Sequence, residues 1–324
     1  MSIASAPDEP IGVVPLKQDA GIIGLVAMAH AASHFGHLLL PPLFPVFMQT
    51  FELGYAQLGL LMTVFFVISG IGQALAGFAV DRVGARPLMF VAIALFMLVC
   101  VLAASASSYS GLLIVAALSG LANATFHPVD FTILNQRVSS ARLGHAYSAH
   151  GLAGNLGWAL APVFLASVTM LTDWRTAYLA AAMVYALVWA TLYLNRAKLL
   201  TTVVARSPQE PAEHSLAFMR QPVVWWCFAF FLFSTITLAV VQNFSVSILQ
   251  AMHSISFRDA TLTVTAYMLC GAVGMLAGGF VAVRARSVDR VVATAMASAA
   301  VLLVLCATGW LGATTTMAVL ASTG

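Results

Sequence analysis

The chain has 324 residues, of which 61% are hydrophobic and 8% are charged, and its mean hydropathy is +0.96. Soluble domains carry about 25% charged residues, so this composition excludes one large soluble domain and indicates a helical bundle in lipid. The net charge of +3 does not indicate nucleic-acid binding, because the basic residues occur singly in short loops. The four cysteines lie in apolar segments without metal-ligand spacing, so we predict neither disulfides nor a bound metal.

Nine apolar segments approach or exceed the length of about 20 residues that a membrane-spanning helix needs. They cover residues 21–48, 57–80, 87–107, 110–135, 146–171, 176–194, 223–249, 261–282 and 291–311. A tenth begins near Thr314 and reaches the last residue, Gly324. Residues 1–20 lack a basic start followed by a short apolar core, so we predict no cleavable signal peptide. The expected fold is therefore an all-α polytopic membrane protein.

The spacing of the segments predicts four parts. These are an N-terminal tail at 1–20, a six-helix half at 21–194, a hydrophilic linker at 195–222 and an incomplete second half at 223–324. If the N-terminus lies in the cytosol, twelve of the 14 Lys and Arg residues fall on the cytosolic side. Because basic loops stay in the cytoplasm, we expect the tail and the linker there.

A short charged turn separates the second and third segments. It reads Gly77-Phe-Ala-Val-Asp81-Arg82-Val-Gly84-Ala-Arg86, and charge of this density belongs at an aqueous face. A weaker copy appears as Gly279-Phe-Val-Ala-Val283-Arg284-Ala-Arg286. Its glycine and first arginine follow Gly77 and Arg82 of the first turn by the same number of residues. Such an internal repeat in an apolar chain indicates two related halves.

Two polar stripes run along the first and fourth segments. They consist of His30, His34 and His37 on one, and of Asn123, His127 and Asp130 on the other. A spacing of i, i+4, i+7 keeps each stripe within about 60° of arc on one helix face. At about 1.5 Å per residue, His30 and His127 both come out near mid-membrane, where the stripes are predicted to meet in a water-filled cavity.

Asp130 is the single carboxylate that we place inside a spanning segment. Ionisable residues in such segments are expensive and usually functional, and histidine titrates near neutral pH. Our hypothesis is that Asp130, His127 and His30 exchange the proton that drives transport. Two alternatives stay open: Asp130 pairs with Arg137 or Arg142 near the cytosol, or the stripes only fix helix packing. His145 and His150 begin the next segment and are expected at the interface.

Several motifs resemble the major facilitator superfamily. The turn at 77–86 is similar to its signature loop between helices 2 and 3, and six helices, a linker and a second half are its layout. Shorter motifs resemble the fosmidomycin-resistance-type branch: Leu39-Leu-Pro-Pro-Leu-Phe-Pro45, Tyr55-Ala-Gln-Leu-Gly-Leu-Leu61, Phe126-His-Pro128, Gly154-Asn-Leu-Gly157 and Trp174-Arg175. The chain departs from these patterns in lacking the helix-4 arginine and in carrying Ser33 and His34 where that branch has an Asn-Asp pair.

The resemblance implies roles for named residues. Helices 1, 4, 7 and 10 of the superfamily line a central cavity, so the substrate and proton pathway is assigned to His30, His34, Asn123, His127, Asp130, Asn155, Gln242 and Asn243. The signature loop gates the cytoplasmic side against helix 11, a role that would fall to Gly77, Asp81, Arg82, Gly84 and Arg86. The superfamily has twelve helices, and this sequence stops in the tenth, which implies an incomplete second half. In addition, Ala153, Gly157 and Ala161 recur every four residues and predict close helix packing.

The leading interpretation is a secondary transporter of the bacterial inner membrane. It would export a small amphiphilic or anionic molecule by alternating access, driven by protons as an antiporter, as a monomer in the lipid bilayer without a cofactor. The chain lacks a Gly-rich loop followed by Lys-Ser/Thr, so ATP is not the expected energy source. The alternatives are a truncated or non-transporting receptor or scaffold and a membrane-embedded enzyme that binds a metal at the histidines. Short loops disfavour an enzyme.

Overall fold

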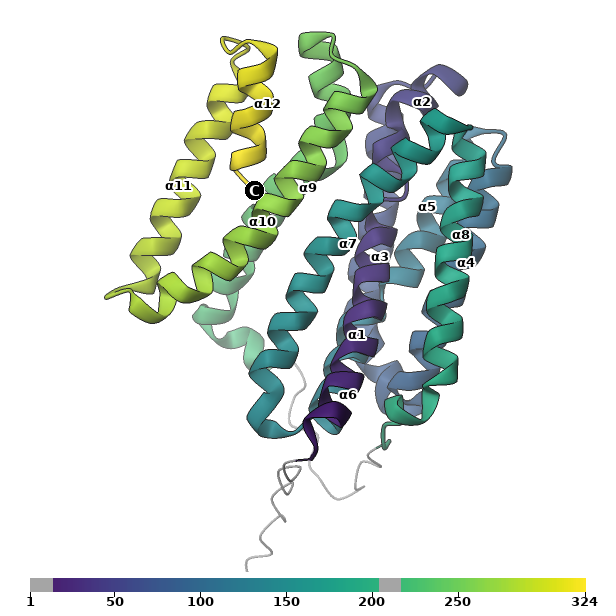
Figure 1. Ribbon diagram of the computed structural model, residues 1–324, viewed down its shortest axis with the longest axis vertical. Coiled ribbons are helices and arrows are strands. Elements are labelled where there is room, and N and C mark those ends of the chain that lie inside the picture. Colours follow the sequence, from purple (N-terminus) through teal and green to yellow (C-terminus); the bar gives the residue numbers. More distant parts are fainter. Residues whose placement is uncertain (1–13, 204–216) are drawn as a thin grey trace, which may run out of the picture.

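The computed structural model describes residues 14–203 and 217–324, which form helices joined by short connections (Figure 1). The first part contains α1 (Leu16–His37), α2 (Phe44–Thr50), α3 (Tyr55–Val83), α4 (Ala85–Ser105), α5 (Tyr109–Asn123), α6 (Phe126–Arg137), α7 (Leu143–Leu171) and α8 (Trp174–Leu194). The second contains α9 (Pro222–His253), α10 (Phe257–Arg284), α11 (Val288–Ala307) and α12 (Ala313–Ser322). Short 3-10 turns are η1 (Pro41–Leu43), η2 (Ser140–Arg142), η3 (Arg196–Leu199) and η4 (Ala217–Arg220). The described residues include no strand.

Within the described residues, nine helical segments are long and apolar enough to cross a membrane, and each overlaps one predicted segment. The all-α polytopic fold is therefore confirmed. The predicted tail lies mostly, and the predicted linker partly, outside the described residues. The side chains of residues 217, 218, 279, 282 and 283 also lie outside the description.

Two of the predicted continuous helices are broken, and proline explains both breaks. The first segment divides into α1 and α2 at Pro41 and Pro42, which lack the N–H group that a helix needs and restrict the residue before them. The fourth divides into α5 and α6 between Asn123 and Phe126, and Pro128 falls in the first turn of α6, where its missing N–H does no harm. Each break lies beside one of the polar stripes.

The six spans from α1 to α8 form the well-packed part of the molecule. Here α1 packs against α7, α4 against α8, and α3 against α5. Tyr178 and Tyr185 on α8 are fully buried and donate hydrogen bonds to the carbonyls of Leu39 (2.7 Å) and Ala32 (2.9 Å). These bonds hold α8 to the α1 region at two levels. Together with α7, α8 therefore encloses α1, which carries three histidines.

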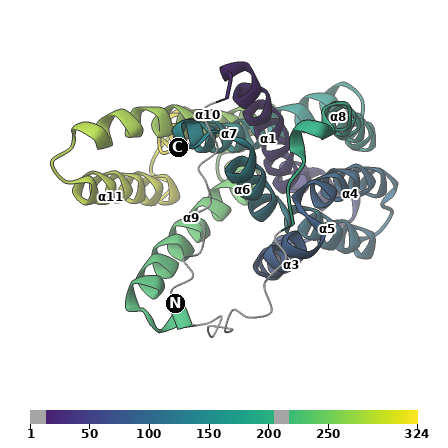
Figure 2. The same cartoon turned by 90° about the horizontal axis from the view of Figure 1, so that it is seen from below.

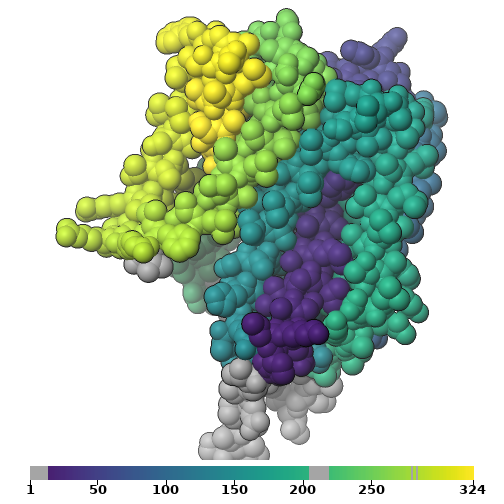
Figure 3. Space-filling model, in the orientation of Figure 1, coloured from purple at the N-terminus to yellow at the C-terminus, as the bar shows by residue number. Residues whose placement is uncertain are grey.

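The helices from α9 to α12 lie to one side of this group, and α10 packs against α7 (Figures 1 and 2). In the most apolar stretch of α9 none of the residues is buried, and in that of α11 6% are. In the space-filling view, α11 and α12 form the outer edge, and α10 lies between them and α7 (Figure 3). Exposed apolar faces on spanning helices are suited to contact with lipid or with further protein.

Both copies of the charged turn occupy the same structural position. In the first, α3 ends at Val83, Gly84 has a positive φ of 87° and α4 begins at Ala85. In the second, α10 ends at Arg284 and α11 begins at Val288. A left-handed φ favours glycine, because any Cβ would be strained there. The repeat therefore corresponds to a helix–turn–helix unit in each part of the chain.

Candidate functional site

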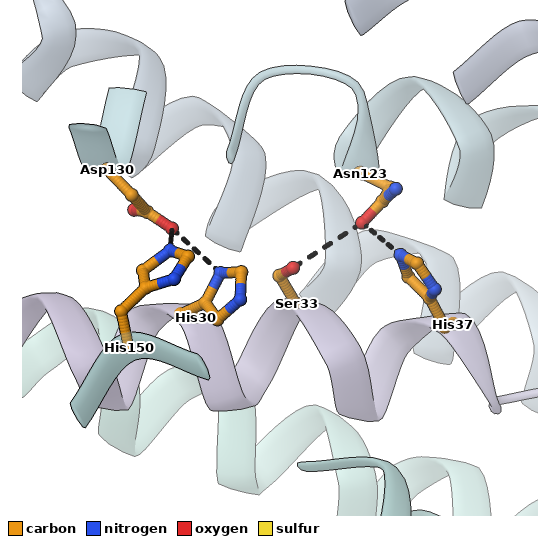
Figure 4. Close-up of polar contacts among 6 residues, drawn as sticks. All are labelled: His30, Ser33, His37, Asn123, Asp130 and His150. Atoms are coloured by element: carbon orange, nitrogen blue, oxygen red, sulfur yellow. Dashed lines mark hydrogen bonds and ion pairs between the residues drawn. The ribbon is translucent and has the colours of Figure 1, made fainter. Parts of the chain in front are cut away.

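The polar stripe of α1 meets Asp130 on α6 in a buried hydrogen bond. His30 Nδ1 lies 2.9 Å from Asp130 Oδ2, and the two side chains are 2% and 0% exposed (Figure 4). A carboxylate oxygen accepts, so the imidazole N–H of His30 donates. Burial of a carboxylate requires such a partner, because an unpaired charge removed from water is strongly unfavourable. The contact joins residues that are 100 positions apart in the sequence.

A third helix contributes to the same carboxylate. His150 on α7 is buried, and its Nε2 lies 3.2 Å from Asp130 Oδ2. The rings of His30 and His150 stack with their centroids 3.4 Å apart (Figure 4). The prediction that His150 is interfacial is wrong, because α7 begins at Leu143 rather than at 146 and carries the ring deeper into the bundle. His145 on the same helix is exposed.

A second network occupies the neighbouring layer toward the end of α1. His37 Nε2 donates to Asn123 Oδ1 at 2.7 Å, and Asn123 Nδ2 donates to Ser69 Oγ on α3 at 2.7 Å. Ser33 Oγ makes a longer contact of 3.4 Å to the same Asn123 oxygen (Figure 4). Both polar atoms of the Asn123 side chain therefore have partners. It connects α1, α5 and α3, a role that suits positioning of helices.

His34 and His127 complete the cluster of rings. The centroids of His34 and His127 lie 4.3 Å and 5.2 Å from that of His30. The Nδ1 atom of His34 is buried and has no hydrogen-bond partner among the described residues, and its ring lies against Trp158. His127 is half-buried. One nitrogen from each of His30, His127 and His150 lies within 4.8 Å of the others, which is a spacing that a metal ion can bridge.

Small residues on α7 let α1 approach closely enough for these contacts. A Cβ atom on Gly154 would lie 2.7 Å from the His34 ring, and one on Gly157 would lie 2.2 Å from the carbonyl oxygen of Ala31. Both distances are too short for a real side chain; at Gly157 the obstacle is backbone, whereas at Gly154 the His34 ring would have to move. The predicted close packing of this face of α7 is confirmed at Gly157.

Three predicted pathway residues lie elsewhere. Asn155 contacts its own helix at Gly151 and the Met275 sulfur on α10, and therefore lies at the α7–α10 contact. Gln242 and Asn243 are buried on α9, where Gln242 contacts the Met268 sulfur at 3.6 Å and Asn243 donates to the Ala239 carbonyl. The structure records no contact between these three described residues and the histidine cluster.

The proposed alternative partner of Asp130 is engaged elsewhere. Arg142 Nη1 lies 2.6 Å from Asp19 Oδ2, and Asp19 is fully buried. The structure shows no contact of Asp130 with an arginine in the described part of the chain. Asp19 lies in the first turn of α1, which begins at Leu16, before the predicted membrane segment at 21–48.

The predicted gating loop lies at one end of the bundle. Asp81 and Arg82 are exposed in the last turn of α3, and Gly84 forms the turn. Arg86 donates to the carbonyl of Arg196 at 3.4 Å, which attaches α4 to the segment after α8. Gly77 has open space around it among the described atoms.

Sequence comparison places the chain in a family. The sequence pattern described as Major Facilitator Superfamily matches residues 26–323, nearly the whole length. The chain belongs to the Major Facilitator Superfamily. The superfamily match and the relatives named as transporters point to a transporter.

Individual relatives of this superfamily member are distant. It is 26% identical to the Fosmidomycin resistance protein of Escherichia coli over 46% of its own length and 36% of that protein. It is 24% identical to the "Probable L-galactonate transporter" of Escherichia coli over 71% of its length and 54% of that protein. The chain thus spans about half or less of these two relatives.

The fold likeness to solved transporters is stronger than the sequence likeness. A bacterial homologue of the human lysosomal transporter Spinster, in its inward-facing and unoccupied conformation, superposes with a TM-score of 0.72 at 16% identity. The superposition covers 96% of this chain and 73% of that one. It supports the fold.

Proposed function

We propose that the chain forms part of a proton-coupled secondary transporter of the bacterial inner membrane. In this proposal residues 21–194 and 223–324 belong to two halves that alternate in access around a midplane site, with the linker at 195–222 and the N-terminus in the cytosol. The observation that carries the proposal is Asp130, a fully buried carboxylate shared by His30 and His150. The transporter works as a monomer without a resident cofactor.

The geometry of the triad suits the transfer of a single proton. With both rings neutral, Asp130 gives the site a charge of −1, and one added proton makes it neutral. A second proton would place two like charges on rings stacked 3.4 Å apart, and their repulsion opposes it. His127 is half-buried beside the triad and offers the route by which this proton reaches solvent.

We assign the transporter to export of a small amphiphilic molecule in exchange for protons. The name of the Fosmidomycin resistance protein supports this direction, and the shared motifs support the branch. A neutral or cationic substrate competes with the proton for the anionic triad, which gives exchange. Asp81, Arg82 and Arg86 are assigned to the cytoplasmic gate, where the exposed charges of Asp81 and Arg82 are available to a partner helix.

The charge of the triad also favours a second candidate, cotransport of a small organic anion with a proton. An anion is repelled by Asp130 until the proton neutralises the site, so proton and anion bind together. The name of the L-galactonate transporter relative supports this candidate. The two candidates predict opposite proton movements: adding the substrate releases protons in exchange and takes them up in cotransport.

A growth screen tests the proposal and finds a substrate. A knockout and an overexpressing strain are grown on a panel of toxic compounds at two external pH values. Export predicts that overexpression raises tolerance to at least one compound, more strongly at the lower external pH. Asp130→Asn should abolish this tolerance, whereas Asp289→Asn, which changes an exposed carboxylate at the start of α11, should keep it. Equal tolerance in every strain would support a receptor or scaffold instead.

A further inference from the structure

The histidine cluster has a property that proton exchange does not require. One ring nitrogen from each of His30, His127 and His150 falls within 4.8 Å of the other two. The three rings come from α1, α6 and α7, so the fold, and not a local sequence motif, brings them together. In a tetrahedral zinc site with Zn–N distances of about 2.0–2.1 Å, ligand nitrogens lie about 3.4 Å apart. The rings must therefore rotate to bring their nitrogens closer together around an ion.

The hydrogen bonds leave one lone pair free on each of the two rings that contact Asp130. His30 Nδ1 and His150 Nε2 both face the Asp130 carboxylate and therefore carry the protons of the neutral rings. This arrangement leaves His30 Nε2 and His150 Nδ1 with unprotonated lone pairs. His127 has no hydrogen bond to another described residue, so both of its nitrogens are available. Neutral imidazole is the form that binds metal.

Asp130 occupies the place of an outer carboxylate partner. Histidine ligands of metals commonly donate their second N–H group to a carboxylate, which fixes the ring and raises its basicity. Here a single buried carboxylate serves two of the three rings, and its negative charge partly offsets a divalent cation. His34 lies next to this group, and its buried Nδ1 lacks a partner among the described residues, so it is the nearest candidate for a fourth ligand.

We propose that His30, His127 and His150 form a binding site for a divalent first-row transition-metal ion of the Zn²⁺ type, supported by Asp130. Imidazole ligands suit Zn²⁺, Co²⁺, Ni²⁺ and Cu²⁺, whereas Mg²⁺ and Ca²⁺ prefer oxygen ligands. The bound ion holds α1, α6 and α7 together. If the proposed function is correct, on which this consequence rests, the ion also blocks proton exchange at Asp130.

Spectroscopic titration with Co²⁺ tests the site. Full-length protein is purified without a histidine tag, with the exposed Cys227 and Cys270 replaced by serine to remove thiol ligands. Four-coordinate Co²⁺ absorbs in the visible range, and the proposal predicts one equivalent of such Co²⁺, displaced by Zn²⁺ but not by Mg²⁺. His127→Gln should weaken binding at least about tenfold, and Asp130→Asn about 10–100-fold.

A matched control variant and a second measurement, thermal unfolding, accompany the titration. His145→Gln changes an exposed histidine on α7 and should bind Co²⁺ like the parent protein. Thermal unfolding without metal checks that each variant is folded, and Zn²⁺ should raise the midpoint of the parent and of His145→Gln only. Absence of the visible bands, or equal binding by His127→Gln and the parent, overturns the site. If the parent protein binds no metal but its proton movement still depends on Asp130, the metal site alone is rejected. If the parent protein binds metal but Asp130→Asn leaves transport unaffected, the proposed function alone is rejected.

Discussion

The contact between α1 and α7 makes a sharp prediction for Gly157→Ala. A methyl group at this position would lie 2.2 Å from the Ala31 carbonyl oxygen, 2.9 Å from its carbon and 3.0 Å from the Cβ of His34. The closest ordinary contacts between carbon and oxygen are about 3.3 Å, so the two helices must separate by about 1 Å. The obstacle includes backbone atoms, which cannot rotate away as a flexible side chain can.

The magnitude follows from two opposing effects. Overpacking costs about 1–3 kcal/mol, and alanine in place of glycine inside a helix returns up to about 1 kcal/mol. We expect a net loss of about 1–2 kcal/mol in the free energy of unfolding, or a fall of about 2–6 °C in Tm. Gly151→Ala is the matched control, because its methyl group would meet only the flexible Met275 sulfur at 3.5 Å. Equal Tm values in detergent for the two variants would refute the packing argument.

Three further predictions concern other polar interactions in the bundle. Arg142→Ala and Asp19→Asn should show a coupling of about 1–2 kcal/mol in a thermal double-mutant cycle, because the pair is partly buried; a coupling below about 0.5 kcal/mol would contradict this. Tyr185→Phe should lose about 1 kcal/mol through its bond to the Ala32 carbonyl, whereas the exposed Tyr193→Phe should not. Asp173 caps the N-terminus of α8, and hydrogen bonds from the Thr176 side chain and backbone hold the pKa of its carboxyl below the usual value. The ionised cap therefore stabilises the protein when the pH is above the usual pKa of an aspartate. Asp173→Ala should therefore lower the Tm relative to the parent protein by its full amount at pH 7, and by less as the pH falls below about 4.

Much of the fold could be predicted because lipid imposes strong rules on sequence. A span must be long and apolar, so the nine segments are visible as such, and the repeated turn marks equivalent ends of helices. The break near Pro128 was less visible, because a short interruption in an apolar segment hardly changes its hydropathy. The boundaries at Leu16 and Leu143 were missed by a few residues for the same reason.

Those small boundary errors decided what could be predicted of the site. Helical spacing was sufficient to bring the α1 and α6 stripes together, since both periodicity and depth are local properties. His150 was missed because its depth depends on where α7 begins, and Asp19 because α1 begins earlier than expected. The placement of Asn155 toward α10 depends on how α7 packs, and nothing in the sequence alone sets that rotation.

Proton movement by the purified full-length protein tests the central claim that Asp130 holds the transported proton. The compound identified in the growth screen is added to protein in weakly buffered detergent, and the pH change is recorded. The account predicts a proton release or uptake that Asp130→Asn abolishes and Asp289→Asn preserves. Undiminished proton movement in Asp130→Asn would contradict it.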